Sequence, residues 1–311
     1  MIMADKQIIF SKYFLMILIS LFLFSSCKPG LEEKGDPAYI SSVKQWHKNR
    51  IERLKKENGW LNLVGLFWLH EGENKFGSAK SNDVVFPEGK SPGLIGTFTL
   101  KDSVVTVNIA EGVNVVNDDK PVSQMIMVND MSGKPTVLKY GDLRWFIIKR
   151  GDRYGIRLRD VNAPLVKKFT DIDTYPINSD WKIEAKFVPY NPPKKLAVPN
   201  ILGMVDEETA SGSLVFQIDG KEYSLDPVDE DGELFIIFAD KTSGKETYGA
   251  GRFLYADKPG PDGKVILDFN KAYNPPCIFT KYATCPLPPQ QNHLQVEVTA
   301  GEKMFHGGAH E

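Results

Sequence analysis

The chain has 311 residues, a formal net charge of −2 and a hydrophobic content of 42%. A nearly neutral chain without a basic stripe or tail lacks the electrostatic footprint of nucleic-acid binding, so we expect no nucleic-acid partner. The 26 glycines and 20 prolines, with frequent Val, Ile, Phe and Tyr, favour a mainly β fold with many turns.

The N-terminal residues have the pattern of an export signal. Lys6 and Lys12 give a positive start, and residues 13–24 form an apolar stretch too short to cross a bilayer. Small residues then precede Cys27, so the segment resembles the lipobox of bacterial lipoproteins. The resemblance implies that residues 1–26 are a cleaved signal peptide and that Cys27 carries a lipid, which makes the membrane a partner. An uncleaved N-terminal helix is the alternative.

The segment behind the cysteine, residues 27–37, is small, charged and turn-prone, which is typical of a flexible tether. Its acidic pair, Glu32 and Glu33, is similar to the surface-export signals of some Gram-negative lipoproteins. We expect a protein of the cell envelope that is anchored to the outer membrane and faces the periplasm. Exposure at the cell surface is the alternative.

The next segment, residues 38–58, is predicted to be a helix that is clearest over residues 38–56. Asp36-Pro37 is a plausible start and Asn58-Gly59 a plausible stop. The residues at three-to-four-residue spacing are Ile40, Val43, Trp46, Arg50 and Leu54. An aromatic-rich apolar run from Trp60 follows, which we interpret as buried β structure.

Residues 59–165 are predicted to form a β-sandwich-like lobe, because short apolar stretches alternate with turn residues. The spacing resembles a forkhead-associated domain. The stretches that carry the resemblance are Gly77-Ser78, residues 82–87, Val116-Asn117-Asp118 and residues 138–142. Ser78 stands where that family has arginine, and neither its Ser-x-x-His step nor its Asn-Gly turn is found. We therefore interpret the sandwich as structural support and do not transfer phosphopeptide binding.

Residues 166–303 are predicted to form a second β-rich lobe, and residues 304–311 a flexible tail. Residues 191–195, which contain two prolines, are interpreted as a hinge between the lobes. Residues 213–225 are interpreted as a β-hairpin around Asp219-Gly220, a favoured two-residue turn.

The densest polar region lies towards the end of the second lobe, and it resembles an uncharacterised bacterial family, domain of unknown function 1684. The motifs that carry this resemblance are Gly249-x-Gly251-Arg252-Phe253, residues 267–277 and residues 282–286. Near the start of the chain, residues 60–69 and Phe76-Gly77-Ser78 are similar to the same family. The resemblance spans about residues 45–303 and implies no particular activity.

The same region supplies the candidate ligand-binding residues. They combine one guanidinium with a carboxylate, two amides and two phenols on proline-stiffened loops: Arg252, Asp268, Asn270, Tyr273, Asn274 and Tyr282. Arginine presents a rigid fork of donors that matches a carboxylate or phosphate, so this set fits a small polar or anionic ligand. The alternative is a structural corner, in which Asp268 pairs with Arg252 and the asparagines cap turns.

Two cysteines, Cys277 and Cys285, remain once Cys27 is assigned to lipid. In an oxidising envelope this pair predicts a disulfide across a small loop. Two buried free thiols, or one reactive thiol, are the alternatives.

No motif predicts a metal or a cofactor. The acidic residues between Asp226 and Glu233 lack the spacing of a calcium loop. A glycine pair separates His306 from His310 in the predicted tail, and the chain contains neither a P-loop nor a Gly-x-Ser-x-Gly elbow. We therefore expect no cofactor.

The absence of a complete catalytic set favours a binding or scaffold role at the envelope. The alternative is an envelope hydrolase in which Asp268 acts as a base with Arg252 and Tyr273. The sequence does not identify the ligand, the membrane leaflet or the oligomeric state.

Overall fold

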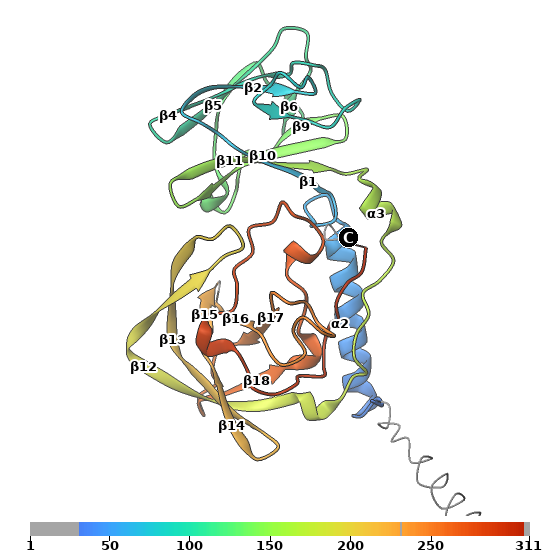
Figure 1. The fold of residues 1–311 in the computed structure, drawn as a ribbon, viewed down its shortest axis with the longest axis vertical. Coiled ribbons are helices and arrows are strands. Elements are labelled where there is room, and N and C mark those ends of the chain that lie inside the picture. The colour runs from blue at the N-terminus through green and yellow to red at the C-terminus, as the bar shows by residue number, and fades with distance from the viewer. Residues whose placement is uncertain (1–30, 231, 308–311) are drawn as a thin grey trace, which may run out of the picture. The chain divides into compact units, whose positions relative to one another are not determined.

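The computed structural model describes residues 31–230 and 232–307. The predicted signal peptide, Cys27 and His310 lie outside these residues. From Lys34 onward the chain forms one compact unit. The fold is mainly β, with a sandwich-like N-terminal lobe and a β-rich C-terminal lobe (Figure 1), as predicted. None of the helices in the described ranges is both long and apolar enough to span a membrane.

The N-terminal lobe is built from two sheets. The larger has the order β1 (Leu63–Trp68), β11 (Arg153–Asp160), β10 (Leu143–Arg150), β9 (Leu138–Tyr140), β6 (Val116–Asn117) and β7 (Lys120–Pro121). The smaller has the order β3 (Val84–Val85), β2 (Gly72–Gly77), β4 (Gly96–Lys101), β5 (Val104–Ile109) and β8 (Gln124–Met127). A 3₁₀ turn, η1 (Asp130–Ser132), follows β8.

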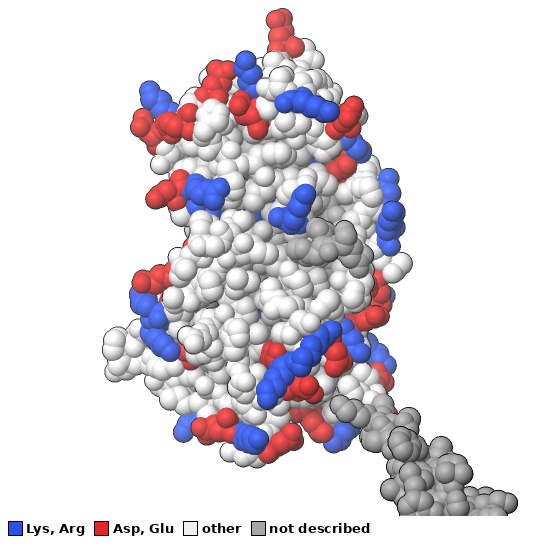
Figure 2. Space-filling view, viewed as in Figure 1, with Lys and Arg blue, Asp and Glu red and all other residues white. Residues whose placement is uncertain are grey.

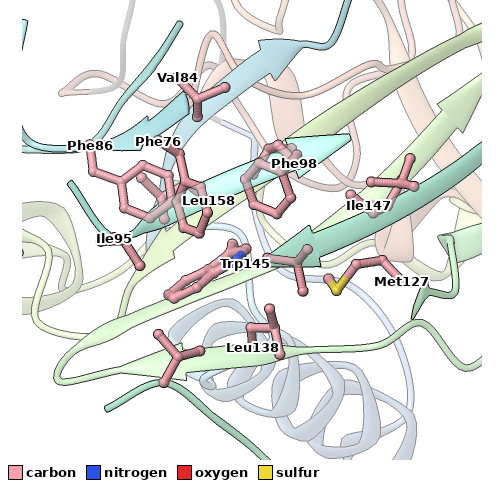
Figure 3. Close-up of a cluster of buried hydrophobic side chains, with 14 of the residues drawn as sticks. Phe76, Val84, Phe86, Ile95, Phe98, Met127, Leu138, Trp145, Ile147 and Leu158 are labelled. Atoms are coloured by element: carbon pink, nitrogen blue, oxygen red, sulfur yellow. The ribbon is translucent and has the colours of Figure 1, made fainter. Parts of the chain in front are cut away.

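These two sheets enclose one hydrophobic core, shown in Figure 3. Phe76 and Phe98 of the smaller sheet stack with ring centroids 4.1 Å apart. Trp145 of β10 lies beneath them, with its ring centroid 5.9 Å from that of Phe76. Alternate residues of β11, including Ile156 and Leu158, also enter this core. The opposite face of β11 therefore points away from the sandwich.

The C-terminal lobe also contains two sheets. One has the order β14 (Lys221–Leu225), β13 (Val205–Ile218), β12 (Lys182–Pro199) and β18 (Lys264–Asp268). The other has the order β15 (Val228–Glu230), β16 (Glu233–Phe238) and β17 (Arg252–Asp257). Short helical turns connect or flank them: α3 (Pro164–Lys168), η2 (Ser179–Trp181), η3 (Phe269–Lys271), η4 (Pro276–Ile278) and η5 (Gln290–Asn292).

The predicted hairpin in this lobe is confirmed. β13 and β14 pair antiparallel, with Ile218 opposite Lys221. Asp219 and Gly220 between them have φ angles of 50° and 73°. Two consecutive residues with positive φ are what a type I′ turn requires.

The predicted hinge at residues 191–195 is wrong. These residues lie inside β12, where the pairing with β13 shifts register between Pro189 and Lys194. Proline has no N–H to donate to a neighbouring strand. Residues in a bulge need no such hydrogen bond, so the prolines fit there while the strand keeps its pairing on either side. The chain instead passes from one lobe to the other between the end of β11 and the start of β12.

The helix α2 (Pro37–Lys55) begins at Asp36, whose carboxylate accepts from the backbone N–H of Ala38 at 2.8 Å. Although α2 precedes the N-terminal lobe in sequence, it packs on the C-terminal lobe (Figure 1), where it contacts η3. Lys34 forms a β-bridge with Asn178, so part of the segment predicted as a tether belongs to the fold.

Part of the predicted flexible tail is also packed in the fold. The ring of Phe305 lies 5.3 Å from that of Phe169 and 5.2 Å from that of Phe279. His306 belongs to the same described stretch, whereas His310 lies beyond it.

Candidate functional site

The structure places Arg252 inside the C-terminal lobe, with no exposed surface. Its guanidinium donates to the carboxylate of Asp240 at 2.9 Å, to the carbonyl oxygen of Val298 at 2.9 Å, and to the carbonyl of Ala300. The carboxylate partner of Arg252 is therefore Asp240. The structural-corner alternative expected Asp268 instead, and that pairing is wrong. These acceptors take up both terminal nitrogens of the guanidinium and only Nε has none, so Arg252 holds the fold together and presents no exposed surface to a ligand.

Asp268 and Asn270 belong to a separate buried network. The hydroxyl of Tyr39 donates to Asp268 at 2.7 Å, and the Asn270 amide donates to the Asp268 carboxylate at 3.3 Å. Lys271 lies 3.3 Å from the other oxygen of Asp268. This network fastens the start of α2 to η3. Because Arg252 is not part of it, the set proposed for a hydrolase is not assembled at one place.

The remaining candidates also separate. The side chain of Asn274 is buried and donates to the carbonyl oxygen of Lys303 at 2.7 Å, which ties down the C-terminal segment. Tyr282 is partly buried, and the ammonium of Lys281 lies 5.5 Å from its ring centroid. Tyr273 is the exception, because it lines a large cavity.

Cys277 and Cys285 are both buried thiols, so the predicted disulfide is not formed. The backbone N–H of Cys277 points at the sulfur of Cys285 over 3.1 Å. A hydrogen bond with Cys285 lowers the pKa of Cys277, while burial raises the pKa of Cys285 well above its usual range. Both side chains pack in one apolar cluster, and this packing accounts for their proximity without a covalent bond.

The cavity that Tyr273 lines has a volume of about 1050 Å³. One wall is the outward face of β10 and β11 in the N-terminal lobe, and the other comes from β13 and β15–β17 in the C-terminal lobe. Residues of α2 complete it, including Trp46 and Arg50. A cavity of this size, lined by both lobes, is large enough for a small-molecule ligand.

The N-terminal wall takes Arg157 from β11, whose residues follow a period-two pattern, and Lys149 and Arg150 from β10. Ile156 and Leu158 face the sandwich core, so Arg153, Arg157 and Arg159 share the outward face. Arg153 is exposed and stacks on Trp68 at 3.9 Å from the ring centroid, whereas Arg157 and Arg159 are buried.

Arg157 is the least satisfied of these arginines. Its side chain is 4% exposed and lines the cavity, yet no Asp or Glu among the described residues lies within ion-pair distance of it. It donates one bond, to the hydroxyl of Thr284 at 3.2 Å, and its Nε has no acceptor. Burial, together with the charges of Arg150 and Arg159, lowers its pKa to about 10. The guanidinium therefore still carries its charge at neutral pH.

The two neighbouring buried or partly buried arginines differ from Arg157. Arg159 donates to the carbonyl of Gly59 and to the side-chain oxygen of Asn62. Arg150 pairs with Asp130 at 2.8 Å and also donates to Thr284 at 3.1 Å. Thr284 thus accepts from two guanidinium groups and orients both at the edge of the cavity.

The C-terminal wall is acidic and aromatic. Glu208 and Asp206 of β13 line it together with Glu230, whose carboxylate accepts from the hydroxyl of Tyr255 at 2.9 Å. The ring of Tyr255 lies parallel to that of Tyr273, with centroids 6.4 Å apart and planes at 10°. The N-terminal wall therefore carries Arg150 and Arg157 and the C-terminal wall is acidic and aromatic, while Arg50, Arg53 and Lys271 of α2 and η3 also line the cavity.

The face of the molecule seen in Figure 2 shows no comparable separation of charge. On the face seen in Figure 2, Lys and Arg alternate with Asp and Glu around the rim, and no described region of that face carries one sign alone. Within the described ranges, no group of three or more His, Cys, Asp and Glu is placed to hold a metal ion.

Sequence reasoning did not single out Arg157 or Glu208. The available signal was the alternation in YGIRLRD, which places arginines and apolar residues on opposite faces of one strand. That pattern ordinarily describes a strand with one face in water. It becomes a buried arginine wall here because the second lobe covers that face.

Comparison with known proteins identifies the second half of the chain. The family model described as "Protein of unknown function (DUF1684)" matches residues 167–303, so the similar motifs between Trp60 and Ser78 lie outside the matched range. Six chains of solved structures match. One is the solution NMR structure of an uncharacterized protein of Haloarcula marismortui, 30% identical, covering 45% of this chain and 80% of that one with a TM-score of 0.38. No curated protein matches.

The matched range contains β12–β18 and the segment up to Lys303, and with them the acidic and aromatic wall of the cavity. The arginine wall comes from β10 and β11, which precede it. Through residues 167–303, the chain belongs to the protein family described as DUF1684.

Proposed function

We propose that this protein binds a small anionic ligand in the cavity and that Arg157 is its principal anchor. The observation that carries the proposal is the state of Arg157: buried, charged and without a carboxylate partner. Removing a charge from water costs several kcal/mol unless a counter-charge compensates. An anionic ligand in the cavity supplies that counter-charge.

The surrounding groups support an anion at this place. A guanidinium offers two parallel N–H donors that match a carboxylate or a phosphate. Thr284 holds the Arg157 guanidinium through Nη2, and Nε is a buried donor that has no acceptor within the protein. Arg150 shares the same threonine and adds a second positive charge. Trp60, whose ring lies 5.4 Å from the Arg157 guanidinium, restricts its movement.

We also propose that the protein works at the cell envelope, held to the outer membrane by lipid on Cys27 and facing the periplasm. The short apolar stretch before the small residues and Cys27 supports this proposal.

The anchor is tested by replacing Arg157 with Met and measuring binding to the purified full-length protein. Phosphate, sulfate, acetate, succinate and citrate are titrated at constant ionic strength, with unfolding temperature and calorimetry as readouts. We expect at least one anion to stabilise the wild type and Arg157→Met to weaken its binding by about tenfold or more. The matched control, Arg153→Met, changes an exposed arginine of the same strand and retains binding.

The ligand-free proteins give a second readout. Replacing an uncompensated buried charge with an apolar side chain of similar length is neutral or stabilising, so Arg157→Met should unfold at the same or a higher temperature. A variant that is at least as stable as the wild type but no longer binds supports an anion anchor. Unchanged affinity in Arg157→Met, or no binding of any anion to the wild type, would refute the proposal.

A further inference from the structure

The acidic wall of the cavity contains a partly buried carboxylate, Glu208, that forms no ion pair with any described residue. Glu208 of β13 stands opposite Leu196 of β12, so the two side chains share one face of the sheet. Leu196 is buried in the apolar cluster that also contains Phe235 and Phe253. Glu208 therefore leaves the strand on the side of the cavity, which it lines.

The carboxylates around Glu208 have hydrogen-bond or ion-pair partners, whereas Glu208 has none among the described residues. Asp206 accepts from the amide of Asn200 at 3.1 Å, Glu207 pairs with Lys195 at 3.3 Å, and Glu230 accepts from Tyr255. Among the described residues, Glu208 has neither an ion-pair partner nor a hydrogen-bond donor. Burial and the charges of Asp206 and Glu230 raise the pKa of Glu208, and the opposing charge of Lys195 does not offset them.

Glu208 and Arg157 line the same cavity but do not compensate each other. They form no ion pair, so their charged atoms are separated by more than the 4.0 Å that defines one. A simple anion at Arg157 leaves Glu208 without a counter-charge, and a simple cation at Glu208 leaves Arg157 in the same state. A ligand that carries both charges compensates both residues.

The aromatic rings beside Glu208 suit the cationic end of such a ligand. Tyr255 stacks on Phe235 at a centroid separation of 4.8 Å and lies parallel to Tyr273. Ring faces attract cations, and the Arg50 guanidinium already lies 4.5 Å from the Tyr273 ring centroid, so the exposed Tyr255 is the ring that remains for an ammonium group. Glu230, held by the Tyr255 hydroxyl, adds negative charge at the same place.

We propose that the ligand is a small zwitterion, with a carboxylate or phosphate at Arg157 and an ammonium group at Glu208 beside Tyr255. This inference rests on the proposed anion-binding function and extends it to the class of ligand. It predicts that the cavity prefers a molecule with both charges to a molecule of the same size with only one.

The test compares probes that differ by one charge. Glycine, glycylglycine and triglycine increase the distance between ammonium and carboxylate, and their N-acetyl and amide forms remove one charge each. Phosphoethanolamine and ethyl phosphate extend the comparison to phosphate. Calorimetry on the full-length protein should show at least one zwitterion binding about tenfold more tightly than either of its singly charged forms.

Glu208→Gln identifies the acidic end. This substitution should weaken binding of the preferred zwitterion by about tenfold. It should leave the affinity for the N-acetyl form unchanged, because that form carries no ammonium group. The matched control is Glu222→Gln, which makes the same change on the exposed strand β14, away from the cavity, and should bind as the wild type does.

The outcomes separate this inference from the anion site. If singly charged anions bind as tightly as zwitterions, and Glu208→Gln changes neither, the zwitterion inference fails while an effect of Arg157→Met preserves the anion site. If no anion and no zwitterion binds, the anion site fails and the inference fails with it.

Discussion

Two arginines buried in this protein have opposite surroundings, and their surroundings determine what each can do. Arg252 reaches a carboxylate and two backbone carbonyls inside the C-terminal lobe. Arg157 reaches one threonine hydroxyl and faces a cavity. The first arrangement compensates the charge within the fold. The second leaves compensation to a molecule from outside.

The pair of Arg252 and Asp240 gives a prediction about stability. Arg252→Gln leaves the Asp240 charge without its partner at a place with no exposed surface, which should lower the free energy of unfolding by about 3–5 kcal/mol. Urea unfolding of the full-length protein measures this change. Lys264→Gln breaks an exposed pair with Glu184 and should scarcely alter stability. Equal effects of the two variants would contradict a structural role for Arg252.

The sequence predicted that polar residues gather around Arg252 and Asp268, but it did not predict which of these side chains pair. Asp268 and Asn270 meet as expected, because positions two apart can share a side of the chain. The partner of Arg252 is Asp240, on a connection between strands that only the folded arrangement brings close. Glu208 and Arg157 were missed for a related reason: burial of a strand's outer face depends on the other lobe.

At the scale of elements, α2 shows how a predicted helix finds its place through polar contacts. Its apolar spacing and its start at Asp36 were readable from the sequence. The surface on which α2 packs could not be read from the sequence, because the contacts are specific hydrogen bonds to residues distant in the chain. Arg50 donates to Glu302 at 3.2 Å and to the carbonyl oxygen of Asn274 at 2.8 Å, and its guanidinium lies 4.5 Å from the Tyr273 ring centroid.

His47 makes the attachment of α2 sensitive to acid. Its Nε2 lies 3.0 Å from the carbonyl oxygen of Asn270, and burial lowers its pKa below the usual value of about 6.5. The unfolded chain therefore takes up a proton at higher pH than the folded protein does. Stability is greatest above the unfolded pKa and falls as the pH drops through about 6.5 towards the lower folded value.

His47→Gln should reduce this loss of stability on acidification, because glutamine retains a donor but does not titrate. The measurement is the free energy of unfolding in urea at several pH values between about 8 and 5. His70 is the control: it is exposed, and hydrogen bonding to the Glu71 carbonyl raises its pKa. His70→Gln should therefore not reduce the acid sensitivity. An identical pH dependence in His47→Gln and the wild type would overturn this assignment.

The wrong hinge shows where local sequence patterns mislead at the element scale. Consecutive prolines usually mark a break between elements. In β12 the prolines lie where the ladder shifts register, so the strand keeps its pairing on both sides of them. The Asp219-Gly220 hairpin was predictable because its turn conformation depends on those two residues alone. A bulge depends on the partner strand, which sequence order does not reveal.

At the scale of the molecule, the cavity requires both lobes. The residues that match the family model supply Glu208 and the tyrosines, whereas Arg157 and Arg150 come from the sandwich that precedes them. The sequence predicted two β-rich lobes but assigned the sandwich to support. The structure gives it one of the two charged walls, and a ligand between the walls would contact both lobes.

The proposed anchor concerns the whole molecule, since it determines where the cavity meets its ligand. Cys27→Ser removes the thiol that would carry lipid, and a single serine cannot replace acyl chains that contribute about 0.8 kcal/mol per buried CH₂. The variant should therefore move from the membrane fraction to the soluble fraction and lose labelling by radioactive palmitate. Cys277→Ser is the control, because it removes a cysteine that is buried in the fold, and it should stay with the membrane and keep its label. If Cys27→Ser remains membrane-bound, the lipid is not the anchor, and the proposal that lipid on Cys27 holds the protein to the outer membrane is refuted.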